Sequence, residues 1–186
     1  MSWRNDRKHY GSISRLLHWL MAVLIIIMLG LGWSLDFIPK EWKPVVLGIH
    51  KSLGIIILML AVARLAWRFY NVPPPLPEFM ERWEKITAVT VHYLLYGLLL
   101  AMPITGWAMT SAKGRPVMFL GIMQLPNLVT KDHELGEWLE EIHSDLAYVL
   151  AVLIALHVMA TLYHHFIKKD SVLTRMWPVS QKNKRP

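Results

Sequence analysis

Four long apolar segments, separated by shorter polar ones, dominate the chain. They run from Ile13 to Leu35, from Val45 to Phe69, from Ala88 to Thr110 and from Ile142 to Ile167. Each matches or slightly exceeds the roughly 20 residues that a helix needs to cross the hydrocarbon core of a bilayer. The pattern predicts an all-α membrane protein, in which residues 1–186 form a single domain built as a bundle of four transmembrane helices.

Composition and charge also indicate a membrane protein. Hydrophobic residues make up 54% of the chain, and the mean hydropathy is +0.35. The net charge is +7, but 14 of the 20 lysines and arginines fall on one side of the predicted bundle, which indicates membrane topology rather than nucleic-acid binding. By the positive-inside rule both termini are expected in the cytoplasm. The 14 residues are Arg4, Arg7, Lys8, Arg15, Arg64, Arg68, Arg82, Lys85, Lys168, Lys169, Arg175, Lys182, Lys184 and Arg185.

Histidines are the chemically distinctive feature of the apolar segments. His143 and His157 are 14 residues apart in the fourth segment, so a helix returns them to nearly the same face, about 21 Å apart. In an antiparallel bundle His157 reaches the depth of His18 in the first segment, and His143 reaches the depth of His50 in the second. Ionisable side chains inside a membrane are costly, and a functional role is the default expectation.

Each depth-matched pair offers one imidazole from each of two helices, which suits the iron of a b haem. His18 and His157 are expected to bind an inner haem, and His50 and His143 an outer haem. The chain has no cysteine, so any haem is bound without a covalent link. Zinc fits less well because neither level offers a third or fourth ligand. A haem-free, histidine-lined carrier of metal ions is the alternative from a different class. His92 has the depth of the inner pair. Simple packing is favoured there, a hydrogen bond to a cofactor edge or to a quinone is the next alternative, and ligation comes third.

Charged residues and a further histidine flank the predicted inner haem. Arg64 and Arg68 lie toward the inner end of the second segment, where guanidinium groups suit haem propionates or a quinone head group. His164 continues the ligand face beyond His157, where an imidazole can hydrogen-bond a quinone and deliver a proton. The sequence assigns no role to His165 and predicts no oligomeric state.

The polar segment from Ser111 to Glu141 is the longest one expected outside the membrane. It is predicted to form a small domain over the outer site. Lys51, with Lys113 and Arg115, is expected to make the mouth of that site positive and to steer an anion toward it. Lys51 is also a candidate for contact with a propionate or a quinone.

Several short motifs carry a family resemblance. They are Leu17-His18-Trp19, His50-Lys51-Ser52-x-Gly54-Ile55, Arg64 with Trp67-Arg68, His143 with Ala147-Tyr148, and His157 with His164-His165 and Lys169-Asp170-x-x-Leu173-x-Arg175-Met176. Together they extend from about Tyr10 to Met176 and resemble the bacterial cytochrome b561 family.

The resemblance implies a specific cofactor set and activity. It implies a four-helix bundle of the bacterial inner membrane with two non-covalent b haems, bound by His18, His50, His143 and His157. It also implies a superoxide oxidase, which passes electrons from periplasmic superoxide through both haems to ubiquinone. No catalytic residue is assigned, because such a reaction needs no general base or nucleophile. Related b-type subunits serve instead as electron relays or membrane anchors for other redox proteins, and this is the main alternative.

Overall fold

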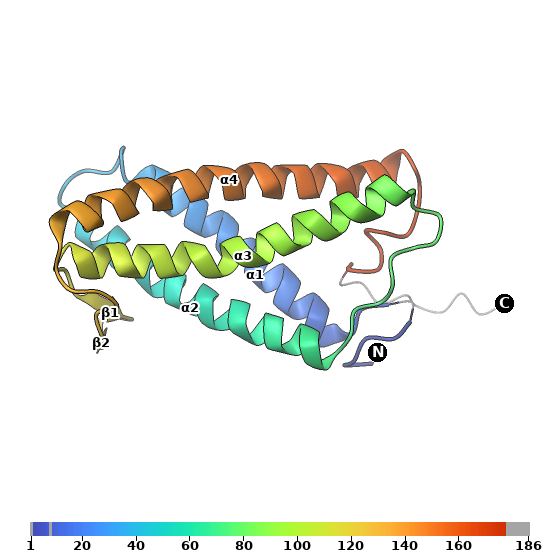
Figure 1. The fold of residues 1–186 in the computed structure, drawn as a ribbon, viewed down its shortest axis with the longest axis horizontal. Helices are drawn as coiled ribbons and strands as arrows, with labels where there is room; N and C mark the ends of the chain where they lie inside the picture. The colour runs from blue at the N-terminus through green and yellow to red at the C-terminus, as the bar shows by residue number, and fades with distance from the viewer. Residues whose placement is uncertain (1, 8, 178–186) are drawn as a thin grey trace.

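A computed structural model, which describes residues 2–7 and 9–177, shows four long helices and a short hairpin (Figure 1). The helices are α1 (Ser12–Ser34), α2 (Lys43–Tyr70), α3 (Arg82–Ala112) and α4 (His133–Phe166). All four are long and apolar enough to cross a membrane, so the predicted four-helix membrane protein is confirmed. Of the basic residues used to predict topology, Lys8, Lys182, Lys184 and Arg185 lie outside the described residues.

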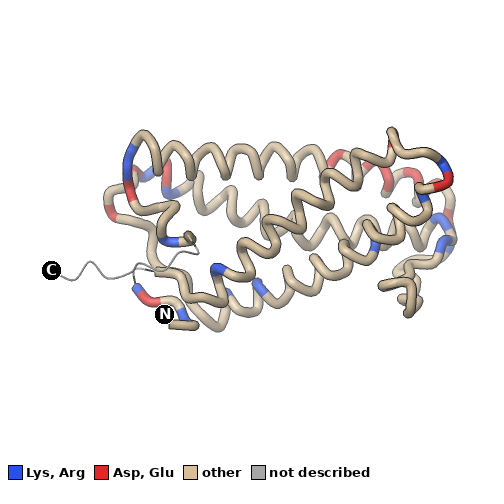
Figure 2. The backbone as a smooth tube through the Cα atoms, turned by 180° about the vertical axis from the view of Figure 1, so that it is seen from behind, with Lys and Arg blue, Asp and Glu red and all other residues tan. Residues whose placement is uncertain are grey.

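The helices pack side by side, with α3 between α2 and α4 (Figure 1). We call the end of the bundle that holds the start of α1 and the end of α4 the inner end, and the opposite end the outer end. The hairpin of β1 (Val117–Phe119) and β2 (Met123–Leu125) lies at the outer end. Charged residues gather toward both ends and leave a largely uncharged middle (Figure 2), as a bilayer requires.

The polar segment between the third and fourth spans is shorter than predicted. We expected it to run from Ser111 to Glu141, but α4 already begins at His133. The side chain of Asp132 caps this helix by accepting a hydrogen bond from the backbone nitrogen of Leu135 at 3.1 Å. Residues 133–141 are therefore outer turns of α4, and only β1 and β2 add regular structure to the rest of the segment.

A small apolar core joins three helices at mid-depth. Met21, Ala61 and Leu99 are buried together there. Leu99 lies seven residues from both His92 and Gly106 in α3, so this core separates the inner and outer histidine levels. Many large apolar side chains elsewhere, such as Val62 and Val152, face outward, as expected where lipid is the solvent.

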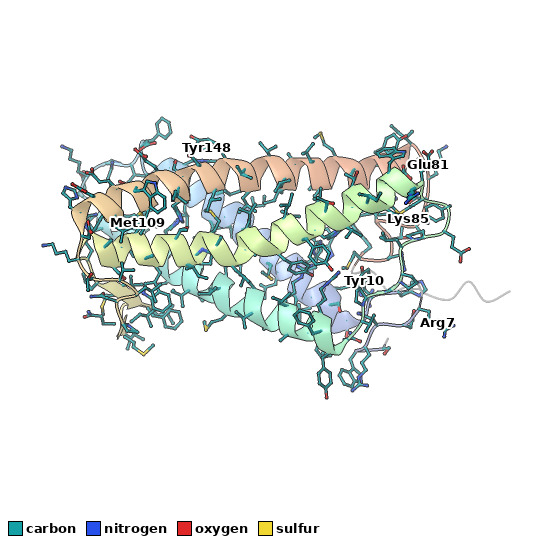
Figure 3. The ribbon with its side chains drawn as sticks, in the orientation of Figure 1. Arg7, Tyr10, Glu81, Lys85, Met109 and Tyr148 are labelled. Atoms are coloured by element: carbon teal, nitrogen blue, oxygen red, sulfur yellow. The ribbon has the colours of Figure 1, made fainter. Side chains whose placement is uncertain are left out.

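The segment after α4 folds back onto the inner end of the bundle. The indole nitrogen of Trp19 donates to the backbone oxygen of Met176 at 2.8 Å. A guanidinium nitrogen of Arg175 donates to the backbone oxygen of Pro75 at 3.0 Å. Tyr10 lies at the same end, as do Glu81 and Lys85 near the start of α3 (Figure 3). The segment after α4 thus helps to fix the geometry of the inner site.

Candidate functional site

Four histidines meet in two pairs inside the bundle. The ring centroids of His18 and His157 are 6.2 Å apart, and those of His50 and His143 are 6.3 Å apart. An imidazole nitrogen binds a metal at roughly 2 Å, so two histidines that share one metal from opposite sides have ring centroids roughly 6 Å apart. Both pairs therefore have the spacing for one shared metal ion.

The outer pair has hydrogen bonds that prepare it for a metal. The hydroxyl of Thr105 donates to the backbone oxygen of Met102 at 2.9 Å, so its lone pairs accept from Nδ1–H of His143 at 3.1 Å. This bond fixes the tautomer that leaves Nε2 of His143 unprotonated, as metal binding requires. Nδ1 of His50 is buried and has no hydrogen-bond partner among the described residues. A buried imidazole in this state fits a group that the protein side chains do not supply.

Glycines leave space beside both outer histidines. A Cβ atom added to Gly106 would lie 3.0 Å from Cε1 of His143, and one added to Gly32 would lie 3.5 Å from Cε1 of His50. At the first position a larger side chain would push the imidazole out of place. The two glycines thus let the imidazoles of the outer pair pack against the backbones of α3 and α1.

His92 belongs to the inner level but is spaced differently. Its ring centroid is 5.2 Å from that of His157, which is too short for one metal between the two imidazoles. Its Nδ1 donates to the backbone oxygen of Ala88 at 2.6 Å. The geometry therefore favours His18 over His92 as the partner of His157 and gives His92 a packing role.

Arg64 contacts the inner pair directly. Its guanidinium nitrogen lies 3.1 Å from Nδ1 of His18. Arginine can only donate, so this nitrogen of His18 accepts and the ring proton is on Nε2. Metal binding through Nε2 requires the opposite tautomer. The inner pair thus has the spacing for a metal, but Arg64 must release His18 before Nε2 can bind one.

The other predicted cationic residues lie at the two ends. Arg64 and Arg68 both lie over the ring of Tyr96, at 5.6 and 5.4 Å from its centroid. At the outer end Lys51 lies close enough to Arg115 for their charges to repel. Lys51 and the two arginines therefore lie at opposite ends of the bundle.

Lys113 does not contribute a free charge to the outer mouth. Its ammonium group pairs with the carboxylate of Glu140 at 2.5 Å. The hairpin reaches the outer site through Ser52, which accepts from the backbone nitrogen of Leu120 at 3.0 Å. Ser52 is two residues from His50 in α2, so the hairpin is anchored at the depth of the outer pair, on a different face of the helix.

His164 lies at the inner end and is buried. Its Nδ1 lies 2.5 Å from a carboxylate oxygen of Asp170, and both side chains are less than one-tenth exposed. Sequence reasoning placed His164 on the ligand face but did not assign Asp170 a role. Thr105 and Gly106 were also missed, because neither residue type stands out in an apolar helix. The only signal for Asp170 was its place in the motif that follows His164-His165.

The described residues contain no group of three or more histidine, cysteine, aspartate or glutamate side chains arranged to hold a metal ion. Within the described residues, each level thus has one pair of histidines spaced to share a metal, His18 with His157 and His50 with His143. Two axial imidazoles are sufficient for a haem iron, whose remaining ligands come from the porphyrin, but not for structural zinc.

Comparison with known proteins identifies the family. The family model for prokaryotic cytochrome b561 matches residues 9–179. The chain is 34% identical to cytochrome b561 homolog 2 of Escherichia coli (strain K12), covering 95% of both chains. It is 32% identical to the probable superoxide oxidase CybB of Yersinia pestis, covering 92% of this chain and 97% of that one. Cytochrome b561 homolog 1 of Escherichia coli is 30% identical, covering 87% and 93%. The chain therefore belongs to the prokaryotic cytochrome b561 family, whose members carry b haem and transfer electrons in the membrane.

Proposed function

We propose that the chain binds two b haems, one on each histidine pair, and transfers electrons from periplasmic superoxide to ubiquinone. The observation that carries the proposal is the repetition of one spacing, 6.2 and 6.3 Å between ring centroids, at two levels of the same bundle. When bound, each haem iron takes up and passes on one electron at a time. A relative of 32% identity is named as a probable superoxide oxidase, which supports superoxide as the donor.

The outer end supports an anionic donor. Lys51 follows His50 directly in α2, and Arg115 lies near it. Two cations that lie close together attract a small anion such as superoxide. Lys113 is excluded from this role because Glu140 neutralises it. The hairpin, anchored on Ser52, would define the path by which the donor approaches His50.

At the inner level Arg64 would exchange one partner for another. We assign it to a haem propionate, with Arg68 as the second cation over Tyr96. Turning to an anion frees Nδ1 of His18 to take a proton, and Nε2 then has the lone pair that iron needs. Arg64 would thus link the binding of the inner haem to the tautomer of His18.

We assign the quinone to the inner end, near His164. This imidazole is seven residues beyond His157, so it lies roughly 10 Å further toward the inner end of α4. A histidine there can hydrogen-bond a carbonyl oxygen of ubiquinone and give it a proton. Both chain termini would then face the cytoplasm and the hairpin the periplasm of a bacterial inner membrane.

An electron relay for another redox protein, or a membrane anchor subunit, is the second candidate. Two relatives of 34% and 30% identity are named only as cytochrome b561 homologs, without a substrate. A haem-free metal carrier has less support, because no three histidine, cysteine, aspartate or glutamate side chains among the described residues are arranged to hold a metal ion.

The test is rapid mixing of the purified, haem-loaded protein with superoxide, with and without a soluble ubiquinone, followed by visible absorbance. Fast haem reduction by superoxide, reversed by ubiquinone, is the expected result. Haems that respond to quinol or dithionite but not to superoxide would overturn superoxide as the donor and favour the relay. Absence of haem would overturn the proposal altogether.

A further inference from the structure

The backbone just after α4 is folded so that Asp170 contacts His164. Lys169 has a φ of +53°, in the left-handed region, and so turns the chain back on itself after α4. The backbone nitrogen of Asp170 then donates to the backbone oxygen of His164 at 3.1 Å. This local fold brings the carboxylate of Asp170 onto the imidazole six residues earlier in the chain.

Both oxygens of the Asp170 carboxylate have partners. One accepts from the backbone nitrogen of Val172 at 2.9 Å, and the other lies 2.5 Å from Nδ1 of His164. A carboxylate can only accept, so Nδ1 of His164 carries a proton. Because the Asp170 side chain is only 9% exposed, water cannot easily replace the imidazole as its partner.

We propose that Asp170 is a positioning residue for proton delivery to the quinone. It fixes the His164 ring with Nδ1 protonated and stabilises the imidazolium form, which gives the proton on Nε2 to a quinone oxygen. A buried carboxylate on Nδ1–H supplies this orientation and charge stabilisation wherever a histidine exchanges protons through Nε2. The inference rests on the function proposed above, since it requires a quinone near His164.

The overall step balances without any further reactant. Ubiquinone takes up two electrons, delivered one at a time from superoxide, and two protons to become ubiquinol. One of these protons comes from Nε2 of His164 and the other from water on the cytoplasmic side, which also returns a proton to Nε2. Each superoxide ion gives up one electron and leaves as O2. Asp170 keeps its negative charge throughout.

Other charged groups also face His164. The carboxylate of Glu84 in α3 lies close enough to interact with it, and the ammonium group of Lys168 is hydrogen-bonded to that carboxylate. The ring of Tyr163 lies 5.9 Å from the His164 ring. Because Lys168 compensates Glu84, Asp170 is the carboxylate whose charge acts directly on the imidazole.

The test compares Asp170→Asn, His164→Gln and the double variant as haem-loaded proteins. Haem reoxidation by ubiquinone is measured from pH 5.5 to 8.5. For Asp170→Asn we expect a rate about tenfold lower at pH 7.5 and a pH profile that differs from that of the unmodified protein, because the imidazole loses the carboxylate that orients its ring. Asp170→Asn should have no further effect in the His164→Gln background. Additive effects there, or a rate and pH profile equal to those of the unmodified protein, would overturn the inference.

Glu137→Gln is the matched control. Glu137 also contacts a histidine, His133, at 3.6 Å, but both side chains are largely exposed at the outer end of α4. This variant should keep the original rate and pH profile. If it slows reoxidation as Asp170→Asn does, the effect is not specific to the buried pair, and the inference is wrong.

A second measurement does not depend on any variant retaining activity. In the unmodified protein with its haems reduced, ¹⁵N spectra of labelled histidine should show several imidazoles with a protonated Nδ1. One of these signals should be missing from the spectrum of His164→Gln. A His164 signal with an unprotonated Nδ1 would contradict the inference even if Asp170→Asn fails to fold. If the unmodified haems are not reoxidised by ubiquinone at all, the proposed function fails instead, which separates the two outcomes.

Discussion

At the scale of the residue, the outer histidine pair depends on two small neighbours as much as on the imidazoles. Thr105 fixes the protonation of His143, and Gly106 leaves room for its ring. A group that orients a metal ligand typically matters nearly as much as the ligand itself. The outer site is therefore a unit of α2, α3 and α4, although α3 contributes no ligand to it.

Replacing Gly106 by valine should empty the outer haem site and leave the inner one filled. A Cβ atom alone would lie 3.0 Å from the His143 ring, and the two methyl groups of valine would displace the ring further. The measurement is haem content per chain after purification, with the absorbance spectrum of the haem that remains.

Gly97→Val, in the same helix as Gly106, is the control for this change. A Cβ added at Gly97 would have no neighbour within 4 Å. It should retain both haems. Equal haem contents in the two variants would show that the space beside His143 is not needed.

The histidines could be predicted from the sequence because an imidazole in an apolar segment is conspicuous, and helix periodicity gives its depth. Thr105 and Gly106 could not, since threonine and glycine are ordinary in membrane helices. The Arg64–His18 contact was also missed. Periodicity placed Arg64 at the inner end of α2, but only the crossing of α1 and α2 brings the two side chains together.

At the scale of the element, the inner ends of α3 and α4 are joined by an ion pair. Glu84, in the first turn of α3, is buried and pairs with Lys168, just after α4. The same carboxylate accepts from the backbone nitrogen of Glu81 at 2.9 Å and so caps its own helix. The Glu84 side chain thus caps the start of α3 and also holds the end of α4, which carries His164.

Lys168→Met should lower the midpoint of thermal unfolding, because it leaves the buried carboxylate of Glu84 without its cation. The carboxylate of Glu84 raises the pKa of Lys168 above its usual value. A raised pKa in the folded state means that the stabilisation is complete below the unfolded value of roughly 10.4 and is lost as the pH rises further. The difference between the two proteins should be constant from pH 7 to 9 and shrink above roughly pH 10.5.

Unfolding followed by haem absorbance across this pH range makes the comparison, with Lys169→Met as the control. Lys169 is the exposed neighbour, so its removal should change the midpoint little. Burial also raises the pKa of Tyr10, but that group titrates in both proteins and cancels in the difference. A Lys168→Met midpoint equal to the original at pH 7 would contradict the account of this ion pair.

Element types were predictable from the sequence, but the ends of the helices were not. Hydropathy falls where a helix leaves the lipid, whereas the helix itself continues until its backbone is capped. The apolar part of α4 begins at Ile142, but the helix itself already begins after Asp132, because Asp132 supplies its cap outside the lipid.

At the scale of the whole molecule, the proposed reaction requires a fixed orientation in the membrane. The chain has no cysteine, so single cysteines can report it. Ile122→Cys, at the hairpin where Ile122 is 84% exposed, should react with a membrane-impermeant maleimide in intact spheroplasts. Lys169→Cys should react only after the membrane is opened. The reverse pattern would put the positive outer mouth in the cytoplasm and exclude periplasmic superoxide as the donor.

The central claim is that two histidine pairs bind two haems, and haem stoichiometry tests it most directly. The measurement is the haem b content per chain of the unmodified protein, His143→Ala and His133→Ala, by the pyridine haemochrome spectrum. We predict two haems in the unmodified protein, one in His143→Ala, and two in the control, whose exposed histidine lies ten residues before His143 in α4. A single haem in the unmodified protein, or two haems retained in His143→Ala, would contradict the account.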